Sequence, residues 1–208
     1  MARKTKAEAE ATRQTILDAA EQVFMDKGVA HASLEEIART AQVTRGAVYW
    51  HFQNKSDVFN AMLERVHLPM AVMVEDAASA QSGDLTALRD LCIFALKTLV
   101  EDKRHCRVYK ILFHHTESDR GLRMQEEIAR ESIEMMTRFF HNHPPHPALT
   151  ATQAARSLHT QMLGIYYDWL RNPDAFDLAA EATSLVDTIF RGICPEGSLS
   201  VKATENSS

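Results

Sequence analysis

Apolar residues recur every three to four positions through most of the chain, which is the spacing of an amphipathic α-helix. The clearest early stripe lies in a helix predicted over residues 8–27, which ends at Gly28 and carries Ile16, Leu17, Ala20, Val23 and Phe24 on one face. Further helices are predicted over residues 85–101, 104–115, 119–140, 150–171 and 178–193. Only 7 Gly and 6 Pro among 208 residues argue against an all-β fold. The chain is therefore predicted to be all-α.

Two short helices joined by a tight turn are predicted within residues 33–55. Ser33 forms a capping box with Glu36 just ahead of an apolar stripe, which fixes the start of the first helix. Thr44 is a good N-cap, so the second helix follows over residues 45–51. This arrangement is typical of a helix-turn-helix motif.

The second of these helices leaves Arg45, Tyr49, Trp50 and His51 mostly on one side. Such a face is costly to leave in water and is unusual without a partner. Arg45 can pair with guanine O6 and N7 or with a phosphate, and Gly46 lets a sugar-phosphate strand approach the backbone. Double-stranded DNA is therefore the predicted partner.

A different explanation applies to some aromatic residues of this segment, which could fill a small three-helix core. We prefer that explanation for Phe52 and for part of Trp50. For Arg45, Tyr49, His51 and Lys55 together, the pattern of charge and polarity favours a binding face instead.

Charge is distributed unevenly along the chain. The net charge is −5, but residues 1–55 hold 8 Lys and Arg against 7 Asp and Glu. Arg3, Lys4 and Lys6 form a basic N-terminal arm that can reach the minor groove or phosphates, unless it is an ordinary solvated tail. Lys55 begins the next helix, which Asn54 caps, and adds an anion site there. The predicted DNA-binding residues are Lys4, Lys6, Ser33, Thr44, Arg45, Gly46, Tyr49, Trp50, His51 and Lys55.

The stretch TRGAVYWHFQNKSDVF resembles the signature of the TetR family of transcriptional repressors. The preceding MARKTKAEAEATRQTILDAAEQVF is similar to the AcrR-type branch of that family. The resemblance implies a homodimer that binds a palindromic operator and leaves it when a small molecule enters a larger C-terminal domain. In that branch the repressed genes typically encode multidrug efflux pumps.

Three regions are expected from the motif and this resemblance. Residues 1–55 form a helix-turn-helix DNA-binding domain, and residues 56–194 form a helical domain for ligand binding and dimerisation. Residues 195–208 are polar and are predicted to form a disordered tail.

An apolar effector pocket is predicted from Met and aromatic side chains on inward stripes of several helices. Met repacks around varied shapes, which suits a promiscuous pocket with few polar anchors, although most of these residues also fit an ordinary core. An acid in the set could neutralise a cationic effector or form a structural ion pair. The candidates are His67, Met70, Phe94, Ile111, Phe113, His114, Glu117, Gln125, Met136, Phe139, Tyr166 and Trp169.

The last two long helices are predicted to form the homodimer interface. In residues 178–193 one apolar stripe holds Leu178, Ala182, Leu185 and Ile189, and a second holds Val186, Phe190 and Ile193. A single core needs only one stripe, so the other is expected to meet a second copy of the chain. The rival explanation is a helix that is fully buried within one copy.

Cysteine and histidine residues suggest an alternative sensing chemistry. Cys92, Cys106 and Cys194 are too few and too widely spaced for a disulfide framework and are expected in the core, although basic neighbours could favour a Cys106 thiolate. A loop is predicted at residues 142–147, and the histidines there, His141, His143 and His146, fit no standard zinc motif, so no metal or other cofactor is predicted. A redox- or metal-sensing TetR-type regulator is the alternative function.

Catalysis and membrane insertion are both disfavoured. The chain contains no nucleophile elbow, phosphate-binding loop, metal-binding helix motif or Gly-rich fingerprint, so we expect no catalytic residue. No secretory signal and no run of about 18 apolar residues occurs, so a cytoplasmic protein with no membrane partner is expected.

Overall fold

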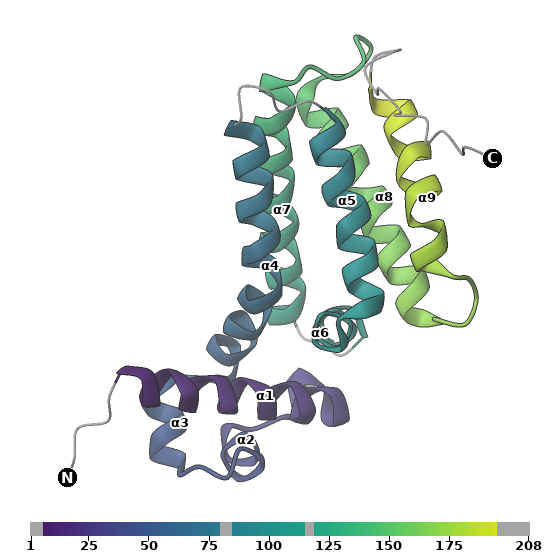
Figure 1. Cartoon of the computed structure of the whole chain (residues 1–208). Helices are drawn as coiled ribbons and strands as arrows, with labels where there is room; N and C mark the ends of the chain where they lie inside the picture. Colours follow the sequence, from purple (N-terminus) through teal and green to yellow (C-terminus); the bar gives the residue numbers. More distant parts are fainter. Residues whose placement is uncertain (1–5, 80–84, 115–118, 195–208) are drawn as a thin grey trace. The chain divides into compact units, whose positions relative to one another are not determined.

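The computed structural model describes residues 6–79, 85–114 and 119–194, and within α4, α6 and α7 it leaves the side chains of residues 67–71, 74–79, 114 and 119–124 undescribed. The described residues form nine helices and no strand, which confirms the predicted all-α fold (Figure 1). The predicted tail at 195–208 and two candidate residues, Lys4 and Glu117, lie outside the described residues.

The chain divides into two compact units. One unit comprises Met1–Pro69 with Asp102–Glu126, and the other comprises Met70–Glu101 with Glu127–Ser208. The first boundary falls inside α4, Lys55–Ser79, which continues as helix through Pro69.

The first unit contains α1, Lys6–His31, α2, Leu34–Thr40, and α3, Arg45–His51. It also holds the first part of α4, all of α6, Lys103–His114, and the start of α7, Asp119–Asn142. Helix α1 packs on α2 and α3 through its apolar stripe (Figure 1). The core of this unit is built on Phe24 and Phe59, whose rings meet edge to face at 5.9 Å.

Gly28 marks the end of the first regular helix, as its sequence position predicts. Its φ of 75° and ψ of 158° are not helical, and a short extra turn carries the segment on to His31. The backbone N–H of Ala32 donates to the carbonyl of Gly28 at 3.2 Å, which closes that turn. Because φ lies in the left-handed region, glycine is the residue that adopts it without strain.

The second unit contains α5, Leu85–Glu101, α8, Ala151–Arg171, and α9, Leu178–Ile193, with the remaining parts of α4 and α7. Helix α5 packs against both α8 and α9. The hydroxyl of Tyr166 on α8 donates to the carbonyl of Ala95 on α5 at 3.1 Å. Arg89 Nε lies 2.5 Å from Asp187 Oδ1, which joins α5 to α9.

The two apolar stripes predicted on α9 both serve the core of a single copy. Six of the seven residues are buried, and only Leu185 is half-buried. The inference that one stripe is surplus was therefore wrong, because α5 and α8 cover a wider arc of α9 than one neighbouring helix would. Any contact of α9 with a second copy must use its other, more polar side.

Among the described residues, no helix combines the length and the apolar character that crossing a bilayer requires.

Candidate nucleic-acid interface

The helix-turn-helix is held in place by caps that its own sequence supplies. The backbone N–H of Glu36 donates to Ser33 Oγ at 3.2 Å, and the N–H of Ser33 donates to Glu36 Oε2 at 3.1 Å, which completes the predicted capping box. Thr44 Oγ1 accepts from the N–H of Ala47 at 3.1 Å and caps α3. The two predicted helix starts are thus confirmed.

These caps bear on two of the predicted DNA contacts. We call the predicted DNA-binding part of the described chain, residues 6–55, the head. The Ser33 hydroxyl donates to Glu36 Oε2 at 3.0 Å, so its proton is already used within the head. The Thr44 hydroxyl acts as an acceptor in its cap and lies on the exposed side of α3. Thr44 is accordingly the better placed of the two to donate to a phosphate.

Gln42 makes the turn between α2 and α3. Its φ of 54° is the left-handed conformation, and it is the only residue other than glycine with a positive φ in the described part of the chain. This conformation is unfavourable for a residue with a Cβ atom. The turn therefore holds a local strain that sets the direction of α3.

Helix α3 presents its aromatic residues to solvent. Tyr49 is 51% exposed and Trp50 is 72% exposed, while Val48 is fully buried against the head. Arg45 and Gly46 at the start of the helix are also exposed, and His51 is half-buried and meets the Trp50 ring edge to face at 4.5 Å. A helix of this kind can lie in a major groove with its exposed side against the bases.

The core explanation considered for Phe52 and Trp50 applies only to Phe52. Phe52 is 4% exposed, and the guanidinium of Arg13 lies over its ring at 5.5 Å. Trp50 does not contribute to the core, because its side chain faces outward along with Tyr49.

Lys55 is engaged inside the head. Its ammonium group donates to the carbonyl of Ala30 at 2.5 Å and to that of Ala32 at 3.4 Å, so it ties the start of α4 to the end of α1. Asn54 caps α4 as predicted, because its Oδ1 accepts from the N–H groups of Ser56 and Asp57. A phosphate near Lys55 would have to share its ammonium group with these two carbonyls.

Known proteins match this chain over nearly its whole length. The family described as bacterial regulatory proteins, tetR family, matches residues 16–62, and the MAATS-type transcriptional repressor C-terminal region matches residues 83–194. The HTH-type transcriptional regulator AcrR of Shigella flexneri is 34% identical over 206 residues, which cover 94% of this chain and 96% of that protein. The chain belongs to the TetR family.

Solved structures of TetR-family repressors agree with this assignment. NalD, the secondary repressor of the MexAB-OprM multidrug efflux pump in Pseudomonas aeruginosa, is 39% identical with a TM-score of 0.80, covering 92% of this chain and all of that one. The complex of SmeT with triclosan is 32% identical with a TM-score of 0.83, covering 91% and 94% of the two chains. The names of these relatives describe transcriptional regulators and repressors, not enzymes.

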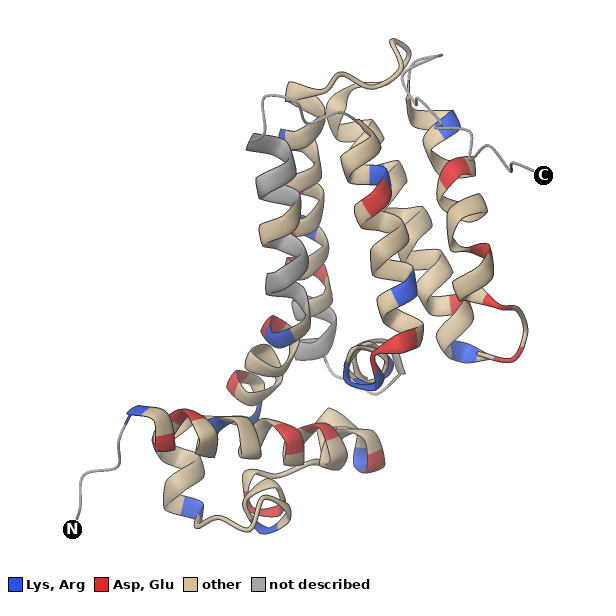
Figure 2. Cartoon of the chain, viewed as in Figure 1, with Lys and Arg blue, Asp and Glu red and all other residues tan. Residues whose placement is uncertain are grey.

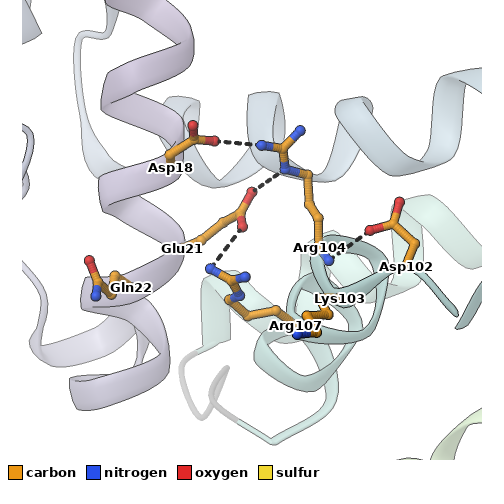
Figure 3. Close-up of a pocket in the computed structure, with 7 residues that line it drawn as sticks. All are labelled: Asp18, Glu21, Gln22, Asp102, Lys103, Arg104 and Arg107. Carbon is orange, nitrogen blue, oxygen red and sulfur yellow. Dashed lines mark hydrogen bonds and ion pairs between the residues drawn. The ribbon is translucent and has the colours of Figure 1, made fainter. Parts of the chain in front are cut away.

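A buried acid on α1 is a feature of this TetR-family chain that our sequence reasoning missed. Glu21 is only 1% exposed, and its carboxylate faces the guanidinium groups of Arg104 and Arg107 (Figure 3), with that of Arg65 as a third. Glu21 Oε1 lies 3.6 Å from Arg65 Nη1 and 3.5 Å from Arg104 Nε, and Oε2 lies 3.6 Å from Arg107 Nη1. Asp18 Oδ1 adds contacts of 2.6 Å to Arg65 and 2.9 Å to Arg104. We call these five residues the α1–α6 ion cluster.

The α1–α6 ion cluster joins three helices of the first unit. Asp18 and Glu21 come from α1, Arg65 from α4, and Arg104 and Arg107 from α6. Burial raises the pKa of the Glu21 carboxyl, and the attraction of the three arginines opposes that rise only in part. A signal was present in the sequence, because Glu21 is four residues after Leu17 and three before Phe24 and so occupies an apolar stripe.

A pocket of about 520 Å³ adjoins the α1–α6 ion cluster (Figure 3). Its lining is charged or polar throughout: Asp18, Glu21, Gln22, Asp102, Lys103, Arg104 and Arg107. This pocket is therefore chemically different from the apolar effector pocket that the sequence predicts.

The predicted effector residues are divided between the two units. In the first unit, Ile111 is fully buried, Phe113 is half-buried, and Gln125 is half-buried and donates to the carbonyl of Leu112 at 2.5 Å. The side chains of His67, Met70, His114 and Glu117 are not described, so their assignment stays a prediction.

The second unit contains the other five candidates in addition to Met70, at which it begins. Phe139, Tyr166 and Trp169 are buried, Met136 is half-buried, and Phe94 is exposed on α5. Tyr166 already donates its hydroxyl proton to the backbone of α5, so it stabilises the packing of α5 on α8. Phe94 lies on the solvent side of α5 within its unit.

Cys106 does not have the properties of a thiolate sensor. It is half-buried, and burial raises the pKa of its thiol more than Lys110 and Arg107 lower it. Cys92 and Cys194 are buried, as expected for core residues. In the loop after α7, His143 stacks on Phe139 at 4.5 Å, whereas His146 is exposed and its Nδ1 accepts from the N–H of Ala148 at 3.2 Å.

Proposed function

We propose that this chain is a dimeric repressor of multidrug efflux pump genes that leaves a palindromic operator when a small hydrophobic or cationic effector binds its C-terminal domain. The observation that carries the proposal is the match, over at least nine-tenths of the chain, to NalD and SmeT. NalD is the secondary repressor of the MexAB-OprM pump, and SmeT is the repressor of the SmeDEF pump.

The DNA contacts follow from the exposed side of α3. Arg45 reads a base edge, and Tyr49 and Trp50 position the helix by contacts to the backbone or to the groove wall. Gly46 supports this role. A Cβ atom added to it would contact only Oγ1 of Thr44, the N-cap of α3, at an ordinary distance of 3.9 Å. Packing within the chain therefore does not require a glycine here, whereas close approach of a DNA strand would. Lys4, Lys6, Thr44, His51 and Lys55 supply phosphate contacts around this centre.

The homodimer interface that we propose lies on the outer sides of α8 and α9. Leu163 and Tyr167 on α8 are 39% and 49% exposed and lie one turn apart. Gly164 sits between them in sequence, and a Cβ atom added to it would meet nothing within 4 Å. Packing within one copy therefore does not require a glycine at this position. A glycine beside exposed apolar residues suits the close approach of a helix from a second copy. Two heads joined in this way would read half-sites about 34 Å apart.

Release from the operator needs a connection between the effector domain and the head, and the α1–α6 ion cluster supports one. A movement of α6 would carry Arg104 and Arg107 away from Glu21, or would pull α1 with them. The effector then acts by binding more tightly to the arrangement that fits the operator poorly, and the loss of DNA affinity cannot exceed that difference.

Operator affinity in the presence and absence of effectors tests this function. The purified protein is titrated onto duplex DNA from upstream of its own gene at a stated salt concentration, with a panel of cationic dyes and with triclosan. We expect tight binding that at least one compound weakens about 5- to 150-fold, the usual range for coupled sites. Tight binding that no compound alters would contradict ligand release, and no preference for this DNA over a random duplex would contradict repression.

A further inference from the structure

The first residue of α3, the predicted recognition helix, forms an ion pair with an acid on α2. Arg45 Nη2 lies 2.6 Å from Oε1 of Glu35, the second residue of α2, and both side chains are exposed. Arg45 is the only Lys or Arg in α3, whose sequence is RGAVYWH (Figure 2). In the protein without DNA, the only guanidinium group of α3 is therefore already paired with a carboxylate.

Glu35 is not a cap of the helix-turn-helix, and an exposed acid in the first turn of a helix stabilises it only slightly. Helix α2 is already capped by Ser33 and Glu36, and Glu36 also forms an ion pair with Lys27. Exposed ion pairs contribute little to folding stability. A carboxylate next to the reading helix also repels phosphates, so it lowers general affinity for DNA. Its position therefore calls for a functional explanation.

The geometry of the pair separates the two ways in which arginine binds DNA. A guanidinium group has five N–H donors, and one contact at Nη2 leaves a complete edge with two parallel donors. Guanine needs such an edge for its O6 and N7 atoms, whereas a phosphate is bound mainly through net charge. Pairing with Glu35 removes the charge and keeps the edge.

We propose that Glu35 is a specificity-determining residue, which holds Arg45 so that it binds guanine and suppresses its binding to phosphates of other DNA. The inference rests on the DNA-binding function proposed above and adds a residue that makes no base contact of its own. Glu35 acts through Arg45, as a positioning residue, and it sets the ratio between operator binding and general DNA binding.

Glu35→Gln tests the proposal because glutamine keeps the length and one acceptor oxygen but loses the charge. Binding of the full-length protein is measured by fluorescence anisotropy on its upstream DNA and on a random duplex of equal length, over a range of salt concentrations. On the random duplex we expect tighter binding, because Arg45 gains a phosphate contact. The slope of the logarithm of the binding constant against the logarithm of salt concentration should become steeper by about one. The ratio of operator to random affinity should fall by about fivefold or more.

Two controls isolate the role of Arg45. Asp26→Asn removes one exposed acid from the same head, on α1, and should leave the ratio within about twofold of the wild type. In an Arg45→Ala background, Glu35→Gln should no longer change the ratio, because its target is gone. Thermal melting of each variant checks that the head still folds.

The outcomes separate this inference from the proposed function. An unchanged ratio in Glu35→Gln, or an equal change in Asp26→Asn, overturns the role of Glu35 while leaving repression intact. A change that persists in the Arg45→Ala background also overturns it, since the carboxylate would then repel DNA directly. A wild type with no operator preference contradicts the proposed function and this inference with it.

Discussion

Gln42 shows how a single backbone conformation fixes the position of the recognition helix. It has a φ of 54° in the turn that joins α2 to α3, where residues with a Cβ atom are strained by about 1–2 kcal/mol. Gln42→Gly should therefore raise the free energy of unfolding by about 1 kcal/mol or slightly less, after the entropy that glycine loses on folding. Urea denaturation at fixed protein concentration measures this difference.

Gln42→Ala is the matched control, because alanine removes the side chain and keeps the Cβ atom. It should leave stability within about 0.5 kcal/mol of the wild type. If glycine were no more stable than alanine at this position, strain in the turn would not be the reason for its conformation.

Arg45 and Tyr49 should differ in the kind of DNA binding that they support. Arg45→Ala should cost about 1–3 kcal/mol of operator binding and relax the preference at one base pair, because it removes a bidentate contact. Tyr49→Ala should weaken binding to operator and random DNA alike, because a backbone contact carries no sequence information. Competition assays with single-base operator variants distinguish the two patterns, and normal operator affinity in both variants would argue against α3 as the reading helix.

The pH dependence of stability should reveal the buried carboxyl of Glu21. Burial raises its pKa in the folded protein above that of the unfolded chain, so the folded state holds the proton more tightly. The resulting stabilisation is fully present below the ordinary Glu pKa of about 4.3 and is lost as pH rises through the folded pKa.

Comparison with Glu21→Gln isolates this contribution. As pH rises from the ordinary Glu pKa towards the raised one, the wild type should lose up to about 1.4 kcal/mol per pH unit relative to the variant. Urea denaturation of both proteins at several pH values measures the difference. Parallel stability curves for the two proteins over this range would show that the Glu21 pKa is not raised.

At the scale of helices, the α1–α6 ion cluster is the feature that should couple the head to the rest of the chain. Glu21→Gln removes the charge that attracts Arg104 and Arg107, so a movement of α6 should pass less effectively to α1. We expect operator binding to persist while the effect of an active compound on operator affinity falls severalfold. Anisotropy titrations with and without the compound give this ratio directly.

Asp187→Asn is a matched control for this variant. It breaks another interhelical ion pair, between Arg89 on α5 and Asp187 on α9, with no residue in the α1–α6 ion cluster. The control should retain the full effector response. Equal losses in both variants would point to general destabilisation and would argue against a specific link between α6 and α1.

Local signals in the sequence were sufficient for the elements of the head but not for their charged contacts. Ser33, Thr44 and Gly28 act on backbone groups within a few residues of themselves, so their roles could be inferred from sequence alone. The ion cluster joins Glu21 to residues more than 40 positions away, and only the fold brings them together. An acid inside an apolar stripe was the available hint.

The difference between local and long-range contacts also explains why the predictions for α9 and Trp50 were only partly correct. Periodicity correctly indicated the apolar residues of α9, but the number of helices that cover them depends on the tertiary arrangement of α5 and α8. Composition equally suggested a core role for part of Trp50, whereas the orientation of α3 turns this side chain to solvent. Whether a side chain is buried depends on which helices pack against it, and the sequence pattern of one helix does not show this.

At the scale of the whole molecule, the two copies expected on a palindromic operator require an interface, and Gly164 gives the sharpest test of its position. Gly164→Leu places a bulky side chain where the monomer has open space, so a single copy should fold normally. If α8 meets its counterpart there, the side chain should prevent close approach, dissociate the dimer and weaken operator binding, since two linked half-site contacts become independent ones. Lys97→Leu, which introduces the same apolar side chain at an exposed position of α5, should leave the dimer intact. Sedimentation velocity over a range of concentrations measures both variants. A Gly164→Leu protein that remains dimeric at the concentrations where the wild type does would place the interface elsewhere.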